Sequence, residues 1–121
     1  MQVNPEVIDS VLSAKKGVTK GFPFDEKTLV YKVGGKMFAL FDVDCFEGVN
    51  LKCDPERAVE LREQYEGVRP GYHMNKVHWN TVMPEPEGDV EEAMFWDLLN
   101  HSYDLVSQSL TKKVKAEIGL S

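Results

Sequence analysis

The sequence has no long hydrophobic run, and this absence limits where the protein is expected to work. No apolar stretch approaches the ~20 residues that a helix needs to cross a bilayer. The N-terminal segment, MQVNPEVIDS, also lacks the basic region and apolar core of a secretory signal. We therefore expect a cytoplasmic protein that has no membrane partner.

Cysteine is scarce, and the motifs of common enzymes are missing. The spacing of Cys45 and Cys53 matches neither CxxC nor a usual zinc pattern, so we expect two free thiols. Four residues separate His73 from His78, which is not the i, i+4 spacing of a metal-binding helix. The chain also has no GxSxG serine and no glycine-rich phosphate loop. We expect no metal, no cofactor and no enzymatic activity.

Acidic residues are missing from two segments of a chain that is acidic overall. The net charge of −6 opposes strong binding to nucleic acid, which requires a basic surface. However, none of the 20 acidic residues lies in residues 27–41 or 67–82. These two segments contain the basic residues Lys27, Lys32, Lys36, Arg69 and Lys76. We therefore expect one surface of the molecule to be locally positive.

Helix-start and strand patterns predict one α+β domain over residues 1–121. Asn4 and Asp54 each precede a proline and a glutamate, which is typical of a helix start. Gly34-Gly35 separates two apolar segments and indicates a hairpin turn. The expected helices are about 5–16, 54–66, 89–108 and 111–118, and the expected strands are 29–33, 36–43, 49–53, 68–72 and 79–82. This order predicts a two-layer sandwich, with helices on one face of an antiparallel sheet.

The segment GYHMNKVHWNTV, residues 71–82, combines ring and amide side chains without one carboxylate. Asn and His side chains often bond to neighbouring amides, so one interpretation is a turn followed by a strand edge. The other interpretation is a contact surface. If Trp79 faces the core, alternation along the strand places His78 and Asn80 outside. Lys32, Asn50 and Lys52 face outward on their own strands by the same argument, and together these side chains form a polar platform.

Three segments resemble the MmcQ/YjbR family of small bacterial proteins. They are FPFDEKTLVYKVGGKMFAL (22–40), NLKCDPERAVELREQYEGVRPGYHMNKVHWNTV (50–82) and HSYDLV (101–106). The resemblance implies a CyaY/frataxin-like fold, in which helices pack on one side of an antiparallel sheet. It also implies DNA binding without enzymatic activity. The matching motif positions are Asn50, Lys52, residues 71–76, residues 78–80 and residues 101–103. We expect His101, Ser102 and Tyr103 to pack within the long helix.

These observations predict a non-enzymatic binding protein that contacts DNA through the polar sheet face and the 67–82 segment. The alternative is an adaptor that binds a protein partner or a small anionic ligand through the same face. The candidate binding residues are Lys32, Lys36, Asn50, Lys52, Arg69, His73, Asn75, Lys76, His78 and Asn80.

Overall fold

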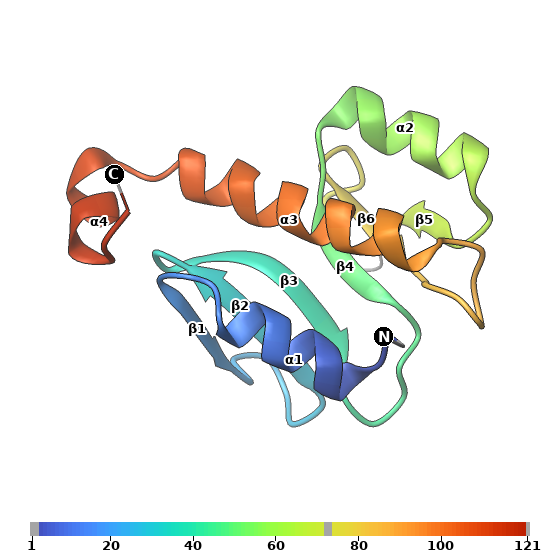
Figure 1. Ribbon diagram of the computed structural model, residues 1–121, viewed down its shortest axis with the longest axis horizontal. Helices are drawn as coiled ribbons and strands as arrows, with labels where there is room; N and C mark the ends of the chain where they lie inside the picture. The colour runs from blue at the N-terminus through green and yellow to red at the C-terminus, as the bar shows by residue number, and fades with distance from the viewer. Residues whose placement is uncertain (1–2, 72–73, 121) are drawn as a thin grey trace.

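The computed structural model describes residues 3–71 and 74–120, so Tyr72 and the candidate residue His73 lie outside the described residues. Within the described ranges, six strands form one sheet and four helices accompany it (Figure 1). The helices are α1 (Pro5–Ser13), α2 (Pro55–Gln64), α3 (Glu92–Gln108) and α4 (Lys112–Glu117). The strands are β1 (Val18–Gly21), β2 (Thr28–Val33), β3 (Lys36–Asp42), β4 (Val49–Lys52), β5 (Val68–Pro70) and β6 (Trp79–Val82).

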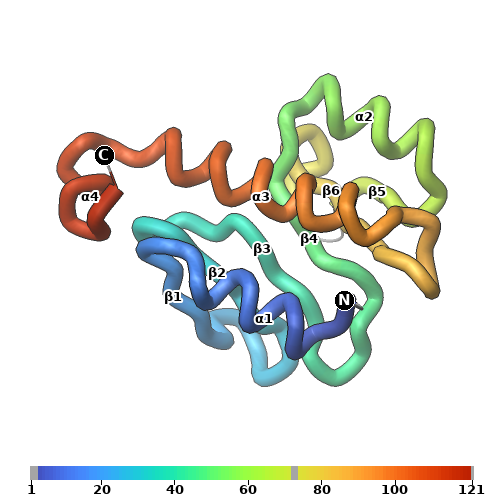
Figure 2. Tube along the Cα trace, viewed as in Figure 1, coloured from blue at the N-terminus to red at the C-terminus, as the bar shows by residue number. Residues whose placement is uncertain are grey.

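The sheet has the order β1-β2-β3-β4-β6-β5, and all five neighbouring pairs are antiparallel. The described helices pack on one side of it, as the ribbon and the Cα trace show (Figures 1 and 2). α3 runs across β3 and β4, while α1 lies against β1. The predicted α+β class, with helices on one face of an antiparallel sheet, is confirmed.

The predicted helix starts are confirmed by the caps that the structure shows. Asn4 Oδ1 accepts a hydrogen bond from Val7 N at 2.9 Å, and Pro5 follows as the first helical residue. Asp54 Oδ2 accepts from Arg57 N at 3.2 Å, again with a proline at the next position. These side chains satisfy amide groups that the first turn of a helix leaves unpaired.

Two parts of the predicted element order are wrong. β1 was not predicted, because a four-residue edge strand with exposed Thr19 and Lys20 carries little apolar alternation. α3 begins at Glu92 and not at Asp89. The Asp89 carboxylate instead accepts hydrogen bonds from Gly67 N at 2.7 Å and Glu66 N at 3.0 Å. It therefore stabilises the turn that leads into β5 rather than the start of the helix.

Apolar side chains lie on both faces of the sheet, but the two groups differ in size. The larger core lies between the sheet and the helices, and includes Tyr31, Phe38, Leu51, Phe95 and Leu99. The smaller cluster consists of Val30, Leu40 and Trp79, with Met37 and Met74 packed against them. We call the face with the smaller cluster the open face, because the described helices pack on the other side.

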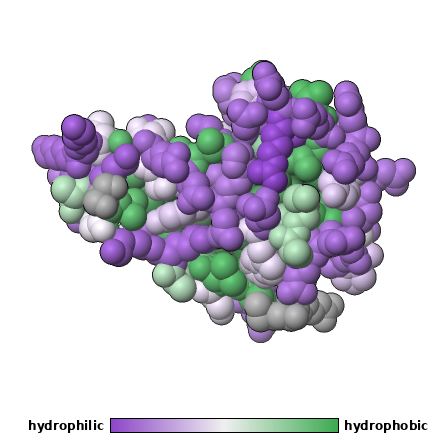
Figure 3. All heavy atoms as spheres, turned by 45° about the horizontal axis from the view of Figure 1, so that its top comes forward, coloured by the Kyte–Doolittle hydropathy of each residue, from purple (hydrophilic) through white to green (hydrophobic). Residues whose placement is uncertain are grey.

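The outer surface of the molecule is mainly polar in the view of Figure 3, where hydrophobic residues show in small separate areas. Single exposed apolar residues are normal on protein surfaces. Phe22 and Phe24 are a different case, because both belong to one loop and are 49% and 65% exposed. This loop joins β1 to β2 and reaches the open face.

Candidate ligand-binding groove

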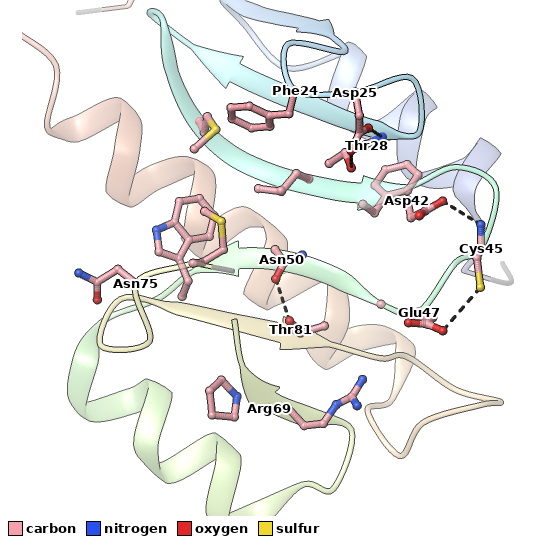
Figure 4. A pocket seen from close by; sticks show the side chains of 17 residues that line it. Phe24, Asp25, Thr28, Asp42, Cys45, Glu47, Asn50, Arg69, Asn75 and Thr81 are labelled. Carbon is pink, nitrogen blue, oxygen red and sulfur yellow. Dashed lines mark hydrogen bonds between the residues drawn. The ribbon is translucent and has the colours of Figure 1, made fainter. Parts of the chain in front are cut away.

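A groove of about 1200 Å³ lies on the open face (Figure 4). Strands β3, β4, β6 and β5 contribute its floor, and the loops before β2 and after β3 contribute its walls. The residues that line it are Phe24, Asp25, Thr28, Met37, Leu40, Phe41, Asp42, Cys45, Glu47, Gly48, Asn50, Arg69, Pro70, Met74, Asn75, Trp79 and Thr81.

One row of side chains crosses the floor of the groove over four strands. The strand register places Leu40 opposite Asn50, Asn50 opposite Thr81, and Thr81 opposite Arg69. Thr81 Oγ1 donates to Asn50 Oδ1 at 2.7 Å. This bond orients the Asn50 amide. Among the described residues, its Nδ2 group has no hydrogen-bond partner, so it is a donor available to a ligand.

One end of the groove is apolar. Met37, Met74 and Trp79 meet there, above the buried residues Val30 and Leu40. Trp79 is only 8% exposed, because it packs in this cluster. Methionine side chains adapt their shape to different contacts, so this end suits an apolar group of a ligand.

The other end of the groove contains carboxylates. Asp42 Oδ1 accepts from Asp44 N at 2.8 Å and from Cys45 N at 2.9 Å. Asp25 Oδ1 accepts from Thr28 N and Lys27 N, and these backbone bonds, with Thr28 first, lower the pKa of the Asp25 carboxyl. Backbone hydrogen bonds thus hold the Asp25 and Asp42 carboxylates in place, and Asp25 stays ionised to a lower pH than an ordinary aspartate.

Cys45 lies beside these carboxylates, but its environment does not activate the thiol. Cys45 Sγ donates to Glu47 Oε1 at 3.6 Å. This hydrogen bond and the adjacent negative charge raise the pKa of the Cys45 thiol. Because the thiolate is the reactive form, the arrangement does not favour nucleophilic chemistry at this cysteine.

Four candidate residues lie on the open face, and for Lys32, Asn50 and Lys52 this is the predicted orientation. Asn50 and Arg69 line the groove. Lys32 lies opposite Met37 in the register of β2 and β3, and Lys52 lies opposite Trp79 in that of β4 and β6. The two lysines therefore flank the apolar end of the groove. Lys36 is exposed where β3 begins, next to the hairpin turn, and does not line the groove.

The predicted orientation of β6 is wrong. Asn80 is 1% exposed and its Nδ2 donates to the Ala58 carbonyl oxygen of α2 at 3.3 Å, so it cannot contact a ligand on the surface. Trp79 lies on the open face instead. The register explains the inversion: Asn80 pairs with Leu51, which faces the helices, and side chains alternate between faces.

The turn before β6 matches the structural interpretation of the 71–82 segment, and part of it also reaches the groove. Asn75 Oδ1 accepts from Val77 N at 2.9 Å, and Asn75 lines the groove. Lys76 Nζ donates to the Gly71 carbonyl oxygen at 3.3 Å. The His78 side chain is exposed, while its carbonyl oxygen accepts from Cys53 N at 2.7 Å.

The packing prediction for residues 101–103 is confirmed. Ser102 is buried, donates to the Phe38 carbonyl oxygen and accepts from Lys52 N at 2.9 Å. His101 Nε2 accepts from Asp54 N at 3.3 Å, and Tyr103 donates its hydroxyl hydrogen to the Lys16 carbonyl oxygen. These motif residues join α3 to the sheet, to the start of α2 and to the segment between α1 and β1, and none of them lines the groove.

Sequence reasoning missed the residues that form the groove walls, namely Phe24, Asp25, Asp42, Cys45 and Glu47. For Phe24 the sequence did contain a signal. Phe22 and Phe24 lie close together in a short loop with a proline, and adjacent exposed aromatic side chains can mark a binding surface. Over the described ranges, no group of three His, Cys, Asp or Glu side chains is arranged to hold a metal ion. Nor is any helix in those ranges long and apolar enough to span a membrane.

Comparison with known proteins gives matches to small bacterial proteins. The Escherichia coli O157:H7 protein YbdF is 40% identical over 93 residues, which are 76% of this chain and 75% of YbdF. The Escherichia coli K12 protein YjbR is 36% identical over 91 residues, 74% of this chain and 75% of YjbR. The names of these relatives state neither a ligand nor a reaction.

A solved structure and a family model agree with these relatives. The crystal structure of the Deinococcus radiodurans protein DR2400, a DUF419 domain, has a TM-score of 0.85 and 38% identity. The match covers 96% of this chain and 88% of DR2400. A Pseudomonas syringae structure, at 24% identity and a TM-score of 0.69, shows the same fold. The YjbR family model matches residues 13–105, and the chain therefore belongs to the YjbR family.

Proposed function

We propose that this protein is a non-enzymatic binding protein and that the groove on its open face receives the ligand. The observation that carries the proposal is the fixed row Leu40, Asn50, Thr81 and Arg69 on the floor of the groove. A preformed concave surface with a few oriented polar groups is typical of binding sites. A cytoplasmic location is part of this proposal.

The chemistry of the groove supports the proposal that the protein is not an enzyme. The Cys45 thiol has a raised pKa, which disfavours the nucleophilic thiolate. The Asp25 and Asp42 carboxylates each accept two hydrogen bonds from backbone amides of their own loops, which fix their positions. Among the described groove residues there is no histidine to act as a base near neutral pH.

A segment of a protein partner fits the groove better than an extended nucleic acid contact. The volume of about 1200 Å³ exceeds the roughly 300–1000 Å³ of common small-molecule pockets. Asp25, Asp42 and Glu47 line one end and repel phosphate groups. For the same reason, a small anionic ligand is a poor fit at that end.

DNA is the second candidate, and the position of the basic residues favours it. Lys32 and Lys52 flank the apolar end of the groove, and Arg69 lies on its floor. Donors of this kind bind phosphate oxygens and base edges. If DNA is the partner, its contact with the open face is confined to the end that lacks carboxylates.

Two-dimensional ¹⁵N NMR spectra of the protein test the proposal and distinguish the two candidate ligands, a protein segment and DNA. One titration uses a set of small aromatic fragments, and the other uses a labelled DNA duplex at low and moderate salt. We expect the fragments to shift the amide signals of Leu40, Asn50 and Thr81. DNA binding would also shift those of Lys32 and Lys52, and would weaken steeply with salt. Shifts confined to residues outside the groove, or no shift in either titration, would refute a binding role for this face.

A further inference from the structure

The charges in the groove are separated along its length, and this separation indicates what the groove binds. Figure 4 shows Asp25, Asp42 and Glu47 near one end of the groove and Asn75 near the other. The three carboxylates come from three places in the chain: the loop before β2, the last residue of β3, and the loop before β4. Folding brings these three carboxylates to the same end of the groove.

Each of these carboxylates is bound to its own loop, Asp25 through both oxygens and Asp42 and Glu47 through one. Asp25 and Asp42 each use Oδ1 to accept from two backbone amides, and Glu47 uses Oε1 to accept from Cys45. In the described ranges, neither Asp42 Oδ2 nor Glu47 Oε2 has a hydrogen-bond partner, and none of the three carboxylates forms a salt bridge. Their negative charge is therefore fixed in position and is available to a cation.

The opposite end supplies apolar contact area. Trp79, Met37 and Met74 form its base, and the 65%-exposed ring of Phe24 lies at the wall. A ligand that matches both ends has an apolar group and a positive charge. Arg69 lines the groove from the edge strand β5 and forms no salt bridge with the three carboxylates. It is a partner for a peptide carbonyl oxygen.

We propose that the occupant is a peptide segment of a partner protein, with an apolar side chain at the Trp79 end and a lysine or arginine at the Asp42 and Glu47 end. The inference rests on the proposed function of the groove. Its size favours a segment of chain over a small metabolite, because about 1200 Å³ exceeds the usual range of roughly 300–1000 Å³ for small-molecule pockets. Charge complementarity between the two ends then sets the direction of the segment and excludes acidic partners.

Selection from a random hexapeptide display library tests this assignment on the purified protein. We expect the selected peptides to combine one or more apolar residues with lysine or arginine at a defined distance. In a double variant, Asp42→Asn with Glu47→Gln, only Asp25 keeps its charge at this end, so the basic preference should weaken while the apolar preference remains. Both substitutions keep the oxygen that binds the loop and remove only the charge. The affinity of a selected peptide should fall about two- to fivefold for each charge removed.

A matched control is available on the surface of α2. Glu60→Gln with Glu63→Gln removes the same charge at exposed positions outside the groove and should leave selection unchanged. Enrichment of acidic or uncharged peptides, a basic preference as strong in the groove variant as in the parent protein, or no enrichment at all would overturn the assignment.

A groove-filling variant distinguishes failure of this assignment from failure of the proposed function. Asn50→Tyr places a ring over the middle of the groove, and Gln64→Tyr adds the same ring on exposed α2. If selected peptides lack basic residues but lose binding only in Asn50→Tyr, the groove binds and the charge assignment is wrong. If Asn50→Tyr binds them as well as Gln64→Tyr does, the groove is not the binding site.

Discussion

Thr81 on β6 donates its hydroxyl hydrogen to the side-chain oxygen of Asn50 on β4, across a strand pair in the floor of the groove, at 2.7 Å. The bond fixes the Asn50 amide in one orientation. Polar groups that are fixed before a ligand arrives lose little freedom on binding, so this pair prepares the centre of the groove for contact.

Replacing Thr81 with valine removes this hydrogen bond and keeps the shape of the side chain. We expect the free energy of unfolding to fall by roughly 0.5–1.5 kcal/mol, the usual contribution of such a bond. Urea denaturation at neutral pH measures the change. Thr19→Val, at an exposed position of β1, is the control and should change stability by less than about 0.5 kcal/mol. Equal effects of the two substitutions would show that the Asn50 contact does not stabilise the fold.

Because Asn80 is buried, a charged residue at this position should destabilise the fold. Asn80→Asp places a carboxylate beside the Ala58 carbonyl oxygen, at a site that is 1% exposed. We expect a loss of about 3 kcal/mol or more at neutral pH, because the charge is buried without a partner. Asn75→Asp, in the exposed turn, retains its acceptor oxygen and should be nearly neutral. Similar stabilities of the two variants by urea denaturation would contradict the observed orientation of β6.

Ser102 joins α3 to two strands, and its removal should weaken the sheet–helix contact. Ser102→Ala leaves Lys52 N and the Phe38 carbonyl oxygen without this partner in a buried region. An unsatisfied buried group typically costs about 1–3 kcal/mol, and we expect a loss in that range. Thermal and urea denaturation check it. The control is Ser10→Ala, on the exposed side of α1, and its stability should stay within about 0.5 kcal/mol of that of the parent protein. If Ser10→Ala loses as much stability as Ser102→Ala, the hydrogen bonds of Ser102 do not explain its effect.

His101 should make stability depend on pH. Burial, followed by the charge of Arg57, lowers the pKa of His101 below its ordinary value of 6.5. The folded state also uses neutral Nε2 to accept from Asp54 N. The unfolded chain therefore takes up a proton at a higher pH than the folded chain. The stabilisation is fully present above about pH 6.5 and is lost as the pH falls through the folded pKa.

The free energy of unfolding, measured by urea at a series of pH values from 7.5 to 5, tests this dependence. In His101→Gln, which cannot titrate there, the decline in stability over the window should be shallower than in the parent protein. His78→Gln is the control, because it makes the same substitution at an exposed position. The account of His101 fails if the parent protein and His101→Gln give the same slope.

Local signals were sufficient to predict most of the fold. Asn4 and Asp54 cap their helices through contacts three residues along the chain, and such contacts can be read directly from the sequence. The hairpin at Gly34-Gly35 is equally local. Asp89 shows the limit of this approach: its carboxylate binds amides of residues 66 and 67, so its role depends on folding and not on its neighbours in sequence.

The orientation of β6 depended on information that the strand itself does not contain. Trp79 and Val82 are both buried, although they lie on opposite faces, because the sheet has apolar clusters on both sides. Alternation gives two equivalent solutions for such a strand, and only the pairing of Asn80 with Leu51 selects one. The groove was missed for a similar reason, because its carboxylates converge from separate loops whose relative positions the sequence pattern does not reveal.

The central claim is that the groove on the open face is the binding site, and one comparison tests it most directly. The affinity of a selected hexapeptide is measured by calorimetry for the parent protein, Asn50→Tyr and Gln64→Tyr, after circular dichroism has shown that all three are folded. The account predicts at least a tenfold loss of affinity for Asn50→Tyr, about 1.4 kcal/mol, and no change for Gln64→Tyr. Equal affinities for the two tyrosine variants would contradict it.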